Sequence, residues 1–220
     1  AVIHCAVTFV TLVVFVDAWP YWKDAGQLMA AYGTGGLPHP TGFPLVASLG
    51  RLASLLPLGS VAFRINLLSA GCAALTSTVL FALVSWLHTA CGRGVHAPKR
   101  PVDGPPTWVW CLAWGAAWAF LAARTVWFHS LATEVYLPSA ALTAAIIAIA
   151  MRSLVKGEDP HRDRTLRFLA LAAGLASGLH VTAFAAGVGA LSLVALAVRR
   201  APPEPTAGGA SGPGAVGGAS

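Results

Sequence analysis

The sequence has few charged residues. Only 10% of its 220 residues are Asp, Glu, Lys or Arg, whereas 56% are hydrophobic. A soluble domain carries about a quarter charged residues, so this composition excludes an ordinary soluble domain. The mean hydropathy of +0.70 indicates instead that the chain lies in a lipid bilayer.

Cysteine is also scarce, and its spacing excludes two kinds of site. None of the four cysteines forms a Cys-x-x-Cys pair, so the sequence predicts neither a disulfide framework nor a zinc site. His88 and Cys91 lie one helical turn apart with His96 nearby, but an ordinary helix end has the same pattern. We therefore assign no metal ligand, and a need for a divalent metal stays open.

The excess of basic residues does not indicate nucleic acid as a partner. The 14 Lys and Arg against 8 Asp and Glu lie mostly in short loops between apolar runs, not on one stripe. Loops 88–107 and 152–167 hold most of them and are therefore expected on the cytosolic side. Lys23, Arg51 and Arg64 are exceptions, because they lie in or beside the first loop, on the opposite side from the two basic loops. The first loop is then outside, which is the periplasmic side if the protein lies in a bacterial inner membrane.

The apolar runs predict an all-α polytopic membrane protein with about six transmembrane helices, each needing about 20 residues. Residues 168–198 carry no formal charge and are too long for one upright span. Arg199 and Arg200 fall on the cytosolic side only if this run forms a hairpin that turns near His180. The predicted spans are 1–16, 61–87, 108–128, 138–151 and the two halves of 168–198.

The chain is expected to contain one folded unit and a tail. We expect the chain to be a fragment of a longer protein, with residues 1–200 as its transmembrane unit; the family resemblance described below implies that this unit is the N-terminal half. Residues 201–220 read "APPEPTAGGASGPGAVGGAS", a composition that cannot bury a core, and are expected to be disordered.

The first outer loop, "YWKDAGQLMAAYGTGGLPHPTGFPL", contains an acid that has two interpretations. Asp24 and Gln27 have the spacing of a helix-capping pair, which is a structural role. A carboxylate held at the membrane rim can also take a proton from an attacking hydroxyl. The two roles are compatible. After this loop, residues 46–56 predict an amphipathic helix that lies along the membrane surface.

Several more ionisable residues are predicted at the same outer face. His39 stands between two prolines on a stiff path, although a solvated histidine at the interface is equally compatible with this position. Ionisable groups are costly near a bilayer, so a group of them suggests a site with acids for an acceptor and cations for an anionic head group. The members are Asp24, His39, Arg64, Arg124, Glu134 and His180.

Three segments resemble a known family: the block from "YWKDAGQL" to "FRINLLSA", then "TVWFHSLATEVY" and "GLASGLHVTA". The chain resembles the bacterial relatives of the vertebrate transmembrane protein O-mannosyltransferase, within the GT-C superfamily of membrane glycosyltransferases. The resemblance implies inverting transfer of a sugar, expected to be mannose, from a polyprenyl-phosphate carrier to an acceptor outside the cytoplasm, a protein hydroxyl or a glycan. It also implies about a dozen spans in the whole protein.

The resemblance assigns roles to individual residues. Asp24 matches the family's catalytic base, and Gln27 stands where the family has a second acid. Arg64 and His180 match positions expected to contact the donor phosphate, with His39 as a second contact and Glu134 as a loop-orienting or acceptor-side group. Asn66 and Tyr136 complete the Arg-x-Asn and Glu-Val-Tyr motifs and are expected to support the site, as is Gln27.

Two other functions remain as alternatives. A transporter or channel would place ionisable residues along the spans, whereas here His4 alone falls inside one. A membrane subunit without chemistry would use the same loops and caps only for structure.

Overall fold

The computed structural model describes residues 1–19, 24–38, 43–91, 105–156 and 162–200. Within these ranges the chain consists of helices and loops without a strand, which confirms the all-α prediction. The helices are α1 (Val2–Phe15), α2 (Asp24–Thr34), α3 (Pro44–Ser54), α4 (Val61–Cys91), α5 (Thr107–Ala122), α6 (Arg124–Leu131), α7 (Tyr136–Lys156), α8 (Arg162–Ser177) and α9 (Val181–Arg200).

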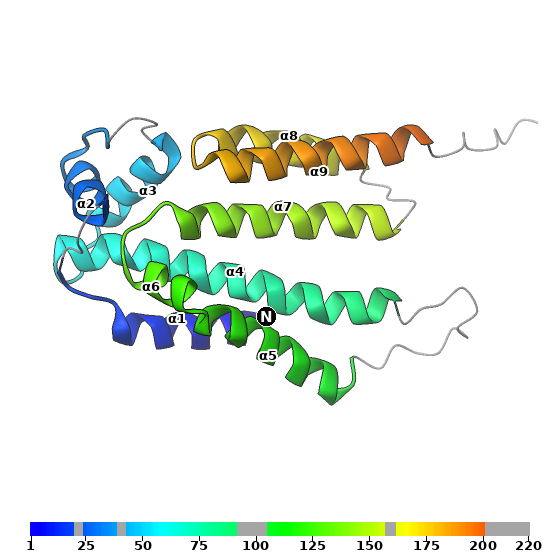
Figure 1. Cartoon of the computed structure of the whole chain (residues 1–220), viewed down its shortest axis with the longest axis horizontal. Helices are drawn as coiled ribbons and strands as arrows, with labels where there is room; N and C mark the ends of the chain where they lie inside the picture. The colour runs from blue at the N-terminus through cyan, green and yellow to red at the C-terminus, as the bar shows by residue number, and fades with distance from the viewer. Residues whose placement is uncertain (20–23, 39–42, 92–104, 157–161, 201–220) are drawn as a thin grey trace, which may run out of the picture.

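The long helices run roughly along one direction, and α2 and α3 lie together at one end of them (Figure 1). Helix α4 is central, since it packs against α1, α5 and α7, while α7 also contacts the α8–α9 pair. The end that carries α2 and α3 also holds the start of α4, the start of α7 and the α8–α9 turn. We call this the capped end of the bundle.

The lengths of the helices bear on the predicted membrane spans. In the described ranges, Val61–Ala90 and Tyr136–Val155 are each long and apolar enough to cross a bilayer, and α5 with α6 adds a third if that bent pair is one span. Helix α1 and the stretch Val181–Ala197 are apolar but shorter. These helices identify an integral membrane protein, while the count of six spans stays a prediction.

The span predicted over 108–128 is not one continuous helix. The expected helix over 108–128 ends at Ala122, and α6 continues at an angle of 71° to α5. Ala123 has φ −59° and ψ 124°, an extended conformation that interrupts the helical hydrogen bonds. The new direction lets α6 pack against α4 and α1. The turn predicted over 129–137 therefore begins inside a helix.

The hairpin predicted near His180 is confirmed. Helix α8 ends at Ser177 and α9 begins at Val181. The two helices approach closely where a Cβ on Gly187 would lie 2.8 Å from Ala173 Cα, so this position requires glycine. At the turn, the Gly178 carbonyl accepts a hydrogen bond of 3.1 Å from the backbone N–H of Leu45, which fixes the start of α3 against the hairpin.

Helix α3 confirms the helix expected over 46–56. The face of α3 that packs against the protein is buried at Val46, Gly50 and Ser54, while Leu49 and Leu52 are exposed, as expected of a helix at a membrane surface. A hydrophobic core joins α2 and α3 to the rest of the capped end, and it contains Leu28, Tyr32, Val46, Ile65, Val135 and Leu179. This core holds the start of α2 beside the loop between α6 and α7.

Candidate active site

Asp24 is the first residue of α2, and its side chain is exposed at the capped end. Gln27, one turn later, is also exposed. The residues before Asp24 lie outside the described ranges, so the capping pair stays a prediction. The neighbouring Ala25 and Leu28 are buried, so the helix is anchored while Asp24 remains accessible. An ionised carboxylate is favoured at a helix N-terminus by the orientation of the peptide dipoles.

Glu134 lies in the loop between α6 and α7 and faces the same region as Asp24. Its side chain is only 14% exposed, and Oε1 lies 3.9 Å from His129 Nδ1. Burial raises the pKa of Glu134, and the negative charge of Asp24 raises it further. The second acid of this site therefore comes from a loop more than a hundred residues after Asp24, and its side chain is largely buried.

Tyr32 is a member of this site that the sequence analysis did not identify. The residue is 1% exposed, and its hydroxyl has no hydrogen-bond partner among the described residues. Burial raises the pKa of the phenol, and the charge of Glu134 adds to the effect. Tyr32 follows Asp24 and Leu28 at four-residue spacing on α2, and this periodicity was the available signal.

Gly50 allows Tyr32 to occupy its place. A Cβ at Gly50 would lie 2.7 Å from Cγ of the Tyr32 ring, so α3 can pack on that ring only through a glycine. Cβ atoms in proteins essentially never approach another heavy atom this closely. The position of Tyr32 beside Glu134 therefore depends on a small residue in the next helix.

Arg64 and Asn66 both bond to protein groups in this structure. The Arg64 guanidinium donates to the backbone carbonyls of Ser54 at 2.7 Å and Gly59 at 3.2 Å, which holds the connection between α3 and α4. Asn66 is fully buried. Its amide N–H donates to the Asp17 carbonyl at 3.1 Å.

Asn66 also supports the loop that carries Glu134. Its side-chain oxygen accepts a hydrogen bond of 2.6 Å from the Thr133 hydroxyl, and Thr133 directly precedes Glu134. Asn66 thus links the end of α1, the start of α4 and this loop. The geometry agrees with a supporting role for Asn66.

His180 lies in the α8–α9 turn at the start of α9. Its Nδ1 lies 2.9 Å from the Thr182 hydroxyl and accepts a longer bond of 3.4 Å from the Thr182 N–H. The imidazole is stacked on the Phe43 ring at 6.5 Å, and the Tyr136 ring is 6.0 Å away. The turn, the start of α3 and the start of α7 therefore meet at His180. His39 lies outside the described residues, and its contact with the donor stays a prediction.

His129 connects Glu134, which lies near Asp24, with Tyr136, which lies near His180. The His129 ring is 5.0 Å from the Tyr136 ring, and His129 Nδ1 faces Glu134. Arg124, at the start of α6, lines a separate cavity of about 710 Å³ together with His129. The structure thus brings Asp24, Glu134, Tyr136 and His180 to one end of the bundle from three separate segments: the start of α2, the connection from α6 into α7, and the α8–α9 turn. In the described ranges, no cluster of three His, Cys, Asp or Glu side chains is arranged to hold a metal ion.

Comparisons with known proteins identified a curated relative and a family model that match the chain. Mouse (Mus musculus) Protein O-mannosyl-transferase TMEM260 is 36% identical to the chain over 91 residues, which make up 41% of this chain and 13% of the mouse protein. The chain thus matches only a small part of the length of that relative. No solved structure matches this chain. Residues 24–201 match the family described as "Protein O-mannosyl-transferase TMEM260 N-terminal domain", and because this match extends over most of the sequence, the chain belongs to that family.

Proposed function

We propose that the protein of which this chain is a part is a membrane glycosyltransferase of the GT-C type. It moves a sugar, mannose, from a polyprenyl-phosphate carrier to an acceptor on the extracytoplasmic side of a bacterial inner membrane, and the acceptor is a protein hydroxyl. The observation that carries this proposal is the meeting of Asp24, Glu134, Tyr136 and His180 at the capped end of a membrane bundle. The family membership supports the same reaction class.

Asp24 is the base of the proposed reaction. The acceptor oxygen attacks the anomeric carbon on the side opposite the phosphate, and its proton passes to the Asp24 carboxylate. The bond between that carbon and the phosphate oxygen breaks in the same displacement, which inverts the configuration of the sugar. An exposed carboxylate at a helix N-terminus suits this role, since it is accessible to the acceptor.

Glu134 acts on the acceptor side. Its carboxyl group, largely buried in the loop between α6 and α7, can hydrogen-bond to the acceptor hydroxyl that Asp24 deprotonates. Burial and the charge of Asp24 raise the pKa of Glu134, so a second negative charge beside Asp24 is less favoured than in water. Gln27, which stands where the family has a second acid, carries no charge.

The leaving phosphate needs positive charge or hydrogen-bond donors nearby. His180 stands at the site with its ring between Phe43 and Tyr136, and we assign it to the phosphate together with His39. Arg64 contributes its charge from the α3–α4 connection, where two backbone carbonyls hold its guanidinium. The bilayer, the lipid-linked donor and the acceptor are the proposed partners.

The test replaces Asp24 with Asn in the full-length protein and measures sugar transfer from a polyprenyl-phosphate donor. Loss of a general base is expected to lower the rate by about 10²-fold to 10⁴-fold. Asp17→Asn is the matched control, because Asp17 is also an exposed acid near this end and only its backbone carbonyl takes part in the Asn66 contact. Undiminished transfer by Asp24→Asn, or an equal loss with Asp17→Asn, would reject Asp24 as the base.

A transporter is the second candidate, and His4 is the observation that favours it. His4 is buried in α1, where its Nε2 lies 2.9 Å from the Ser77 hydroxyl, which itself donates to the Ala117 carbonyl. These bonds join α1, α4 and α5, an arrangement typical of a polar contact between membrane helices. Solute movement in proteoliposomes without sugar transfer would favour the transporter over the enzyme.

A further inference from the structure

Two buried polar atoms at the capped end lack a hydrogen-bond partner within the described ranges, the Tyr32 hydroxyl oxygen and His129 Nδ1. Such atoms are rare in folded proteins, because a buried donor or acceptor without a partner costs the free energy of removing it from water. Both lie near the same side chain, Glu134, and neither has a part in the reaction described above. The Glu134 carboxyl group is therefore the common neighbour of two unpartnered polar atoms.

Tyr32 comes to Glu134 from the hydrophobic core of the capped end. The Tyr32 side chain is buried in the same core as Val135, the residue directly after Glu134. The negative charge of Glu134 acts on the phenol and adds to the rise in its pKa that burial causes. A phenol with a raised pKa keeps its proton, so the Tyr32 hydroxyl is available as a hydrogen-bond donor to a carboxyl oxygen.

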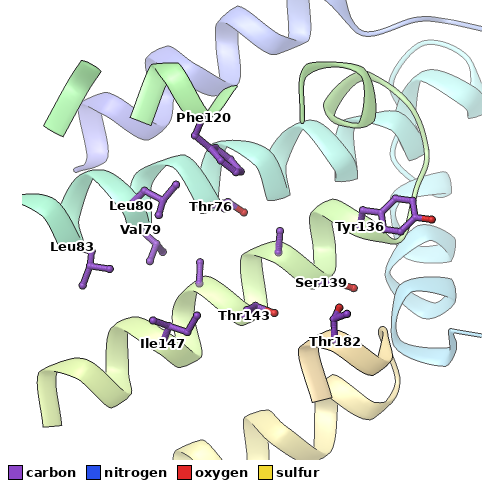
Figure 2. Close-up of a pocket in the computed structure, with 12 residues that line it drawn as sticks. Thr76, Val79, Leu80, Leu83, Phe120, Tyr136, Ser139, Thr143, Ile147 and Thr182 are labelled. Carbon is purple, nitrogen blue, oxygen red and sulfur yellow. The ribbon is translucent and has the colours of Figure 1, made fainter. Parts of the chain in front are cut away.

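His129 comes to Glu134 from α6. Its Nδ1 lies 3.9 Å from Glu134 Oε1, which is about 1 Å longer than a hydrogen bond. The His129 ring is 5.0 Å from the Tyr136 ring. Figure 2 shows Tyr136 at the end of the cavity between α4 and α7, with its hydroxyl group pointing towards the capped end. This aromatic contact holds the imidazole beside Glu134, so a small movement of the carboxyl group is enough to form the bond.

The backbone on both sides of Glu134 is anchored, whereas its carboxyl group is not. The preceding Thr133 donates to Asn66 at 2.6 Å, and the following Val135 is buried in the core. Among the described residues, the carboxyl group has only the 3.9 Å contact with His129. Rotation of the Glu134 side chain can therefore bring its oxygens to both unpartnered atoms without a movement of the loop.

We propose that Tyr32 and His129 are positioning residues that hold the Glu134 carboxyl group between them when the sugar donor is bound. The Tyr32 hydroxyl donates to one carboxyl oxygen, and His129, with its proton on Nδ1, donates to the other. Each oxygen has a second lone pair, so one remains free for the acceptor hydroxyl. This inference rests on the proposed function, in which Glu134 meets that hydroxyl. Hydrogen bonds of this kind are often long in an empty site and shorten when substrate binds.

Tyr32→Phe in the full-length protein tests the first bond. The substitution removes the hydroxyl oxygen and leaves the ring on which α3 packs, so the Tm is expected to stay the same or to rise. The kcat of sugar transfer should fall by about tenfold or more, while the KM for polyprenyl-phosphate mannose changes by less than about twofold. An unchanged kcat, or a lower kcat accompanied by a lower Tm, would overturn the proposal.

Ser85→Ala is the matched control for Tyr32→Phe. It also removes one buried hydroxyl oxygen, but that hydroxyl lies in the other half of α4 and already donates to the Phe81 carbonyl at 2.9 Å. It should change kcat by less than about twofold. A loss equal to that of Tyr32→Phe would mean that any buried hydroxyl has this effect and would reject the role of Tyr32.

His129→Phe and His129→Asn separate the second bond from ring packing. Phenylalanine keeps an aromatic contact with Tyr136 and lacks Nδ1, whereas the asparagine amide offers a donor near the position of Nδ1 and lacks the ring. We expect kcat to fall by about tenfold or more in His129→Phe and by less than about threefold in His129→Asn. Equal losses, or the reverse order, would overturn the assignment of His129.

Both residues must act through Glu134. Glu134→Ala removes the carboxyl group, so adding Tyr32→Phe or His129→Phe to it should lower kcat by less than about a further twofold. Losses that multiply would contradict a positioning role.

A structure of the full-length protein with polyprenyl-phosphate mannose bound tests the contacts without sugar transfer. The Tyr32 hydroxyl oxygen and His129 Nδ1 should each lie within about 3.2 Å of a Glu134 carboxyl oxygen, and a longer distance for either would overturn the proposal. If both contacts form in a protein that transfers no sugar, the proposed function fails and the positioning of Glu134 stands. If sugar is transferred and the contacts are absent, the proposed function stands and the positioning fails.

Discussion

Replacing Gly50 with alanine tests whether the packing of α3 on Tyr32 builds the candidate site. The added methyl carbon would lie 2.7 Å from Tyr32 Cγ, whereas carbon atoms pack best at about 3.5 to 4.0 Å. Helix α3 or the Tyr32 ring must therefore move by roughly 1 Å. Overpacking of this kind costs about 1 to 3 kcal/mol, which lowers the Tm by roughly 2 to 12 °C for a domain of this size.

The assay combines thermal unfolding of the full-length protein with sugar transfer. Gly33→Ala is the matched control, since Gly33 lies in α2 and a Cβ there meets only Val61 Cγ1 at 3.5 Å, an ordinary contact. This control is expected to be neutral or stabilising by up to about 1 kcal/mol, because alanine favours the helix. Gly50→Ala should lower both the Tm and the transfer rate.

A double substitution determines whether the contact with the ring is the cause. Tyr32→Leu removes the ring that the new methyl group meets, so Gly50→Ala should cost less in that background. Full additivity of the two substitutions, or a Gly50→Ala variant as stable as the parent protein, would refute the reasoning.

Two further variants test the loop that holds Glu134. Asn66→Ala removes the hydrogen-bond partner of the Thr133 hydroxyl and that of the Asp17 carbonyl. It should therefore lower the free energy of unfolding by about 2 to 4 kcal/mol, whereas Thr133→Val should lower it by about 1 kcal/mol. Chemical unfolding measures both values. Because the pKa of Glu134 is raised above 4.5, its contribution to stability is present at low pH and is lost as the pH rises through the raised pKa. Glu134→Gln should therefore unfold at a higher temperature than the parent protein near pH 8 and lose that advantage near pH 4, and an advantage that grows towards low pH would contradict this assignment.

The sequence predicted the elements that depend on local patterns. Helix α3 follows from its amphipathic spacing, and the α8–α9 hairpin follows from an uncharged run bounded by arginines. Ser60, which directly precedes α4, is a residue type favoured at a helix N-terminus, and its hydroxyl accepts the Phe63 N–H at 3.1 Å. In each case neighbouring residues carry enough information to define the element.

The features that the sequence did not predict depend on distant contacts. The α5–α6 break at Ala123 contains neither proline nor glycine, and it becomes understandable only from the packing of α6 on α4 and α1. The proximity of Tyr32 to Glu134 and the bond from Thr133 to Asn66 join segments that lie far apart in the chain. Asp24, Glu134, Tyr136 and His180 were all predicted as site residues, but the placement of Glu134 near Asp24 and of Tyr136 near His180 required the fold.

The bond between Leu45 and Gly178 constrains the order of events during biosynthesis. Its two partners are separated by 133 positions, so the α2–α3 segment leaves the ribosome well before its anchor on the last hairpin exists. At about 5 to 20 residues per second, that interval lasts roughly 7 to 27 s. A nascent chain therefore carries Asp24 early, but it cannot fix the start of α3 against the hairpin until α8 and α9 have been synthesised.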